Sequence, residues 1–282
     1  MDNVERVDAG KLRIFREKTY LILIIFLSII IWAFVILSFF SPNQIEELIA
    51  TSEAKVGDRF EPFFTPAFIL GFFLTGLFSH LLAIAYIRLN GIKVGPNQFS
   101  EIAKSIENLS ARLGLKKAPD AFVINGNGVL NAFAARLVFR RIIVIYSNLA
   151  EALIDLNDQK QLDAVIAHEL GHHALLHTHI VDWFLSPGKL VPFLGSALSR
   201  AREYSSDRVM KALIGDGEVC EKALVKLAAG GVLGSRVNVN AYLSQVKEER
   251  GFFAWLAETI STHPHLPKRI VAMRKHLVDS KV

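Results

Sequence analysis

The chain has 282 residues, of which 51% are hydrophobic and 21% are charged, with a net charge of +5. This composition excludes an intrinsically disordered chain, which would be poorer in apolar residues and richer in charge. A single cysteine, Cys220, excludes a disulfide-stapled secreted domain and a four-sulfur metal site. The small basic excess contains no block of Lys or Arg, so lipid contact is compatible with it and nucleic-acid binding is not expected.

Two long apolar runs near the N-terminus account for the hydrophobic excess. In residues 20–40 only Ser28 and Ser38 are not hydrophobic, and residues 63–87 contain no Asp, Glu, Lys or Arg. A helix of about 21 residues spans roughly 31 Å, the thickness of a hydrocarbon core, so both runs predict transmembrane helices. A secretory signal peptide is the alternative for the first run, but the run is too long and no small-residue cleavage site follows it.

The charges that flank the two runs predict their orientation. Residues 1–19 hold five Lys and Arg, whereas residues 41–62 hold two against five acidic residues. By the positive-inside rule, the segment 1–19 is cytoplasmic, the spans 20–40 and 63–87 form a hairpin, and the loop 41–62 is external. Residues 88–282 then form a cytoplasmic domain that is long enough for one hydrophobic core.

His80 lies within the second apolar run. An ionisable group inside a membrane span is a functional candidate by default. The interpretation that we favour is a neutral imidazole near the helix end that is hydrogen-bonded to a neighbour, because histidine is less costly to bury than Lys or Asp.

The first part of the domain combines helices with a small sheet. Helical periodicity over residues 98–113 ends at a glycine, and β-branched runs at 121–124 and 142–146 predict two strands. Asn157 or Asp158 is a plausible N-cap for the next helix, which runs to residue 176. This pattern is typical of an α+β fold that is mostly helical.

The remainder of the domain is predicted to be helical. Residues 180–197 are apolar but contain Asp182, Lys189, two prolines and two glycines, so we expect a loop and a helix start that touches the membrane surface at most. A helix over 193–214 and three short helices follow, the last of which ends near residue 278.

The strongest motif is His168-Glu169-Leu-Gly-His172, inside the predicted helix from residue 158. Residues four apart face the same side of a helix, so both histidines can turn a ring nitrogen toward one metal ion. Glu169 lies beside them, where it can hold the water that the metal activates and take its proton. The nearby and later histidines are expected to be solvated surface residues: His173, His177, His179, His265 and His276.

A catalytic zinc commonly takes three protein ligands and leaves a fourth position for water. The metzincin pattern is excluded because its glycine and histidine positions are Leu175 and Thr178. The other arrangement takes a glutamate from a later helix, and Glu203, 31 residues beyond the second histidine, is the best candidate. Asp207, one turn further on, can accept the second ring N–H of a ligand histidine. The alternative ligands are Glu218 and Glu221.

Four motifs follow one another over roughly residues 120–271. They are Asn131-Ala-Phe-Ala134, His168-Glu-Leu-Gly-His172, the stretch from Ser199 to Asp207, and Ser261-Thr-His263-Pro264 followed by Arg269-Ile270. Together they resemble peptidase family M48, the membrane-associated zinc metallopeptidases. The resemblance implies a zincin-like (gluzincin) fold with one Zn²⁺ per chain, held by His168, His172 and Glu203.

The resemblance also implies roles for three further groups. Residues Asn131, Ala132, Phe133 and Ala134 would form an edge strand that pairs with an extended substrate, although a turn-and-core segment is the alternative. His263 would donate a hydrogen bond to the oxyanion, although His-Pro also fits a simple helix-start turn. Arg269 would support the site by pairing with Asp207 or with the substrate.

The resemblance and the topology together imply a membrane-anchored zinc endopeptidase of the bacterial inner membrane. Its catalytic domain would face the cytoplasm, and its substrates would be polypeptides, chiefly damaged membrane proteins. The CAAX branch of the family has many more spans, so prenyl-protein processing is not expected. The alternative from another class is a membrane-tethered chaperone or scaffold with a structural zinc, which Glu169 disfavours because such a site needs no general base.

Overall fold

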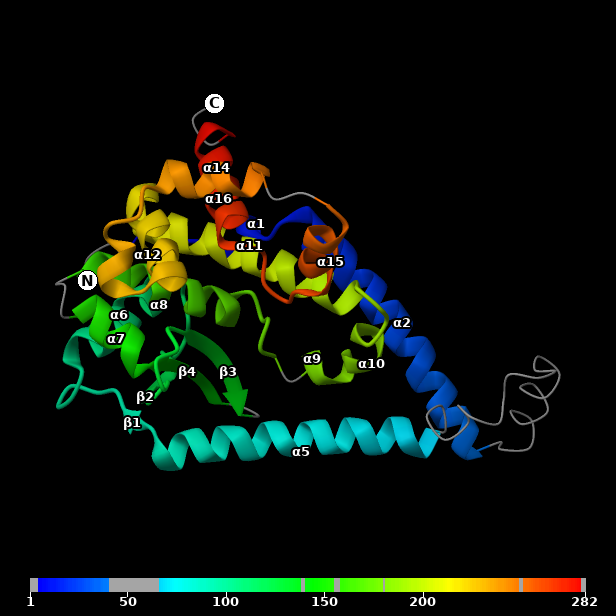
Figure 1. The fold of residues 1–282 in the computed structure, drawn as a ribbon. Helices are drawn as coiled ribbons and strands as arrows, with labels where there is room; N and C mark the ends of the chain where they lie inside the picture. Colours follow the sequence, from blue (N-terminus) through cyan, green and yellow to red (C-terminus); the bar gives the residue numbers. More distant parts are fainter. Residues whose placement is uncertain are drawn as a thin grey trace.

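The computed structural model describes residues 5–40, 66–137, 140–154, 158–179, 181–248 and 251–279 (Figure 1). The expected external loop 41–62, Asn157 as a helix cap and the side chain of His276 lie outside the described residues.

Two helices carry the apolar runs of the N-terminal region. After the single turn α1 (Ala9–Leu12), α2 covers Phe15–Phe40 and α5 covers Pro66–Asn90, so both extend a few residues beyond the predicted cytoplasmic boundaries. Within the described residues, these are the two helices that are long and apolar enough to cross a membrane, with mean hydropathy of 3.1 and 2.1. Few of their side chains are buried within the protein, which agrees with contact to lipid.

A four-stranded sheet has the order β1-β2-β4-β3. Its strands are β1 (Ile92–Lys93), β2 (Asp120–Ile124), β3 (Ala132–Leu137) and β4 (Arg140–Tyr146). β2 and β4 are parallel, whereas β1 and β3 pair antiparallel with their neighbours. The two strands predicted from β-branched runs are therefore confirmed, and β3 occupies an edge of the sheet. The two-residue β1 was missed because it is too short to show periodicity.

Helices cover both faces of this sheet. On one face lie α6 (Ser100–Arg112), α7 (Ser147–Ile154) and α8 (Gln159–Ala174), where Ile143 and Ile145 of β4 join the main core. On the other face, Ile142 and Val144 belong to a second apolar cluster that includes Ile84 of α5 and Phe122 of β2, and α5 contacts β2 and β3. The end of a candidate membrane span therefore packs directly on the sheet (Figure 1).

The apolar segment after α8 is more ordered than predicted. Residues expected to form a loop instead form two single turns, α9 (Val181–Phe184) and α10 (Ser186–Lys189), between α2 and α5 (Figure 1). Trp32 Nε1 donates to the Phe184 carbonyl at 2.8 Å, and the ring of Phe184 lies 5.9 Å from that of Phe73 on α5. At Gly188 an added Cβ would lie 2.5 Å from the carbonyl oxygen of Ile24, so the close contact with α2 requires glycine.

The long helix α11 (Leu194–Ile214) agrees with the prediction and ends at Gly215, whose φ of +75° suits glycine. Five helices rather than the predicted three follow it among the described residues. They are α12 (Gly217–Ala229), α13 (Gly231–Gly234), α14 (Val239–Glu248), α15 (Phe252–Ile260) and α16 (Leu266–Asp279).

A close contact between α8 and α11 sets the geometry of the site. At Gly171 an added Cβ would lie 3.2 Å from Val209 Cβ and 3.3 Å from Ser206 Cα. The glycine within the His-Glu-Leu-Gly-His motif thus lets the two helices approach closely, and it brings their polar residues to one place.

Candidate active site

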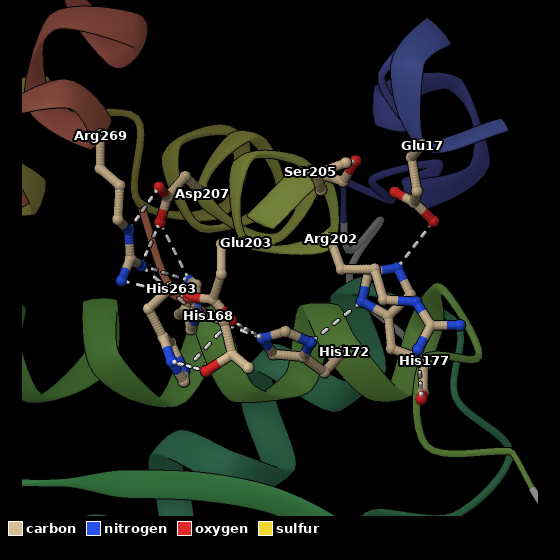
Figure 2. Close-up of polar contacts among 12 residues, drawn as sticks. Glu17, His168, His172, His177, Arg202, Glu203, Ser205, Asp207, His263 and Arg269 are labelled. Carbon is tan, nitrogen blue, oxygen red and sulfur yellow. Dashed lines mark hydrogen bonds and ion pairs between the residues drawn. The ribbon is translucent and has the colours of Figure 1, made fainter. Parts of the chain in front are cut away.

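Three side chains from two helices converge beside this contact. His168 and His172 project from α8, and Glu203 meets them from α11 (Figure 2). The Nε2 atoms of the two histidines are 3.2 Å apart, and they lie 3.4 Å and 3.3 Å from different oxygens of Glu203. In a tetrahedral site with bonds of about 2.0–2.1 Å, neighbouring ligand atoms are about 3.4 Å apart. The donor set and its spacing therefore fit a zinc ion.

A buried ion pair supports two of these side chains. Arg269 of α16 donates from Nε and Nη2 to the two carboxylate oxygens of Asp207, at 2.8 Å and 2.6 Å. Its Nη1 lies 3.2 Å from Glu203 Oε2. Asp207 Oδ1 also lies 3.0 Å from His168 Nδ1, so it accepts the ring N–H and leaves Nε2 for a metal. Of the two partners expected for Arg269, the structure shows Asp207.

The electrostatics of this cluster favour a cation. Burial is the largest influence on the pKa of Glu203 and Asp207 and raises it, but the Arg269 guanidinium and the hydrogen bonds of these carboxylates together outweigh burial and hold both pKa values below their usual range. Burial and Arg269 lower the pKa of His168, yet its hydrogen bonds to Asp207 and Glu203 outweigh them and raise it to about 10. The two ionised carboxylates carry one more negative charge than the guanidinium balances. This excess stabilises positive charge at the histidines, either as a proton or as a metal ion.

The cluster opens into a cavity of about 220 Å³. Glu169 and residues 131–134 of the sheet edge line it together with the three ligand candidates, and His263 stands at its rim with a 69% exposed side chain. His263 Nε2 is 3.8 Å from Glu203 Oε1. The structure thus brings the favoured site residues of the sequence analysis to one cleft, except Asp207, which lies behind His168. The alternative ligands Glu218 and Glu221 do not line this cleft and pair instead with Lys222 and Arg274.

The cleft also has an apolar wall that the sequence analysis missed. It is formed by Met210 of α11 and by Ala223, Leu224 and Leu227 of α12. The apolar positions of α12 were readable as one helix face, but only the fold shows that this face borders the cleft.

The prediction that the neighbouring histidines are solvated is wrong for His173 and His177. His173 is 1% exposed and hydrogen-bonds the Ile142 carbonyl at 3.0 Å, which ties α8 to β4. His177 is 7% exposed and lies against His172 and Glu17. Burial lowers the pKa of both His173 and His177 to about 3.

The other histidines agree better with expectation. His265 is exposed and His179 is half-buried. His80 has the hydrogen-bonding neighbour that we expected, because its Nε2 lies 3.1 Å from the Arg136 carbonyl of β3.

The fold and the site together define a class of protein. The domain is mostly helical α+β, its two histidines and one glutamate can hold one metal ion, and two candidate membrane spans lie next to it. These features are those of a zincin-like membrane metallopeptidase. The chain belongs to Peptidase family M48, whose sequence profile matches residues 96–186 and 179–277.

Two sequence relatives agree with this assignment. A protein of Halobacterium salinarum named Protease HtpX homolog is 31% identical over 229 residues, which cover 63% of this chain and 77% of the relative. A Protease HtpX homolog of Helicobacter pylori is 26% identical over 233 residues, covering 68% and 72%. The crystal structure of S. mikatae Ste24p is similar with a TM-score of 0.47 and 20% identity, over 73% of this chain and 58% of that one.

Proposed function

We propose that this chain is a zinc-dependent endopeptidase in which His168, His172 and Glu203 hold one Zn²⁺. The convergence of their ligand atoms within 4.8 Å of one another, at the floor of a cleft, is the observation that carries the proposal. When bound by these residues, a zinc ion would supply Lewis acidity and would lower the pKa of a bound water molecule.

The residues around the ligands have distinct roles in this proposal. Glu169 is 7% exposed in the cleft, where it takes a proton from the attacking water and later passes it to the leaving amine. His263 at the rim donates a hydrogen bond to the oxyanion of the tetrahedral intermediate. Asp207 and Arg269 fix the ring of His168 from behind.

Replacement of Glu169 tests the chemistry. Glu169→Gln keeps the shape of the side chain and removes the base, so cleavage of casein is expected to fall by about 10²–10⁴-fold. The matched control is Glu218→Gln, whose side chain is 75% exposed, and it should retain full activity. Chelation should abolish the wild-type activity and zinc should restore it. Full activity of Glu169→Gln would favour the alternative, a tethered chaperone or scaffold with a structural zinc.

We propose that the edge strand β3 binds the substrate backbone. The Tyr146 N–H donates to the Asn131 carbonyl at 2.9 Å, and such pairs alternate along an antiparallel ladder. The backbone groups of Ala132 and Ala134 therefore point away from β4, on the cleft side of the sheet. An extended peptide that pairs with them would lie along the ligand cluster, and it would be recognised with little dependence on its sequence.

Proline substitutions separate this role from strand stability. Ala134→Pro removes an outward N–H, so cleavage should fall sharply while the fold is retained. Ala135→Pro is the matched control: its N–H points toward β4, so this variant should destabilise the sheet itself. Normal cleavage by Ala134→Pro would refute strand pairing.

We further propose that α2 and α5 span a bacterial inner membrane as a hairpin, with residues 1–19 and 88–282 in the cytoplasm. The basic residues of the N-terminal segment support this orientation. The packing of α5 on the sheet supports a position of the cleft close to the membrane, and such a position would favour damaged membrane proteins as substrates. Trapping of membrane proteins on Glu169→Gln in native membranes tests the substrate class, and protease protection of the C-terminus in sealed spheroplasts tests the topology.

A further inference from the structure

Glu17, at the start of α2, is distant in sequence from the residues that line the cleft. Hydrogen bonds nevertheless connect its side chain to one of them. Its side chain is 1% exposed and its Oε1 lies 3.0 Å from His177 Nε2. His177 Nδ1 lies 2.9 Å from His172 Nδ1 (Figure 2). A continuous chain of polar contacts thus leads from the first turn of a membrane helix to a ligand candidate.

The direction of these hydrogen bonds follows from the ligand role of His172. A neutral imidazole that binds metal through Nε2 carries its proton on Nδ1. This N–H donates to His177 Nδ1, so His177 carries its own proton on Nε2. That second N–H donates to the Glu17 carboxylate. Each ring in the chain is thereby fixed in one tautomer, and the chain ends on a negative charge.

The two ligand histidines have parallel support. The Nδ1 of His168 reaches the buried carboxylate of Asp207 directly, at 3.0 Å. The Nδ1 of His172 reaches the buried carboxylate of Glu17 through one intervening imidazole. Carboxylates that accept the second N–H of a ligand histidine orient its ring and raise its basicity. Glu17 stands outside the region that matches the family, residues 96–277, so the family match assigns it no role.

We propose that Glu17 and His177 are positioning residues that orient His172 for metal binding. A carboxylate of the membrane helix α2 would thus fix the ring of a metal ligand through one intervening imidazole. This inference rests on the proposed zinc site. It implies that the ligand geometry of the catalytic domain depends on the docking of α2. The docking contact itself includes Arg13, which lies 3.2 Å from Glu17 Oε1 and donates to the Leu175 carbonyl at the end of α8.

Zinc affinity of the full-length protein in detergent or nanodiscs tests the proposal. Glu17→Gln keeps the size of the side chain and removes its charge, and His177→Phe removes the relay ring. Both should weaken zinc binding about 10–100-fold in competition with a chromophoric chelator. Both should also change the visible absorption bands of the Co²⁺-substituted protein, which report ligand geometry and which a stability loss alone would not move.

A double variant distinguishes a relay from independent effects. If Glu17 acts through His177, the variant with both substitutions should bind zinc no more weakly than His177→Phe alone. Arg13→Gln removes the cationic partner of Glu17 and leaves both members of the Glu17–His177 contact in place, so it should lower thermal stability while zinc affinity is retained. Glu221→Gln is the distant control, since Glu221 is a buried carboxylate paired with Arg274 at 2.7 Å, and its zinc affinity should equal that of wild type.

The outcomes separate the two proposals. If wild type binds one zinc and Glu17→Gln binds it equally tightly with an unchanged Co²⁺ spectrum, the relay is refuted and the zinc site stands. Additive losses in the double variant would also refute the relay. If wild type binds no zinc, the proposed function fails and the relay fails with it.

Discussion

Removal of Arg269 should destabilise the fold strongly, and zinc should reverse part of the loss. The guanidinium is 6% exposed and lies 2.6 Å from Asp207 and 3.2 Å from Glu203, which are 2% and 8% exposed. Arg269→Met keeps most of the apolar volume of the side chain and leaves two buried carboxylates with protonated His168 as their remaining counter-charge.

The distances set the size of this effect. Opposite unit charges about 3 Å apart attract by about 5 kcal/mol at an effective dielectric constant near 20. Part of this attraction offsets desolvation, and loss of one partner from a buried pair costs about 3–5 kcal/mol. For a domain of this size each kcal/mol lowers Tm by about 2–4 °C, so we expect a decrease of about 6–20 °C without metal.

Thermal unfolding with and without zinc is the assay. A divalent cation beside Glu203 and His168 restores the charge balance, so saturating zinc should raise the Tm of Arg269→Met more than that of wild type. Arg274→Met removes a cation that is 40% exposed from an ion pair with Glu221, and because water can replace an exposed cation it should cost less than Arg269→Met. An unchanged Tm of metal-free Arg269→Met, or equal zinc-induced shifts in both proteins, would refute this account of the charge balance.

Three other predictions concern the packing around the site. Gly171→Leu should lower the free energy of unfolding by about 1–3 kcal/mol, because a larger side chain overlaps Val209, and a variant as stable as wild type would contradict the close helix contact. Cys220 is buried, and burial raises the pKa of its thiol to about 12. Iodoacetamide at pH 8 should therefore alkylate it only after denaturation, and rapid labelling of the native protein would disprove the inertness of the thiol. Lys226 is 2% exposed and pairs with Asp158. In chemical denaturation Asp158→Ala should lower the free energy of unfolding by about 3 kcal/mol, whereas Lys226→Met should be neutral or stabilising. The reverse order would contradict a buried charge at Lys226.

The ligand candidates were predictable because local geometry determines them. A spacing of four residues on a helix places His168 and His172 on one face whatever the rest of the fold does. The partnership of Asp207 with His168 followed from the same reasoning, because one turn of α11 separates it from Glu203. By contrast, the positions of the edge strand and of His263 came only from the family motifs, since their approach to the cleft depends on long-range packing.

The environment of His177 was not predictable in this way. Helix-end reasoning placed it in solvent, but Leu176 adopts a left-handed conformation with φ of +62°, which turns the chain back on α8. The His177 N–H then donates to the His172 carbonyl at 2.9 Å, and its ring lies beside that of His172. A positive φ at leucine is uncommon, so the sequence gives no signal of this turn. The second hydrogen-bond partner of the His177 ring is Glu17, which is 160 residues away in the sequence.

The contact between α5 and β3 connects a candidate membrane span with the proposed substrate strand. Along β3, the outward-facing carbonyls alternate from Ala132 to Ala134 to Arg136. The last of these is engaged by His80 of α5 at 3.1 Å, whereas the first two border the cleft. On the proposed function, a substrate strand pairs with Ala132 and Ala134 and reaches α5 at the next pairing position. On this proposal, the contact of His80 with the Arg136 carbonyl limits how far the bound segment can extend along β3 toward α5.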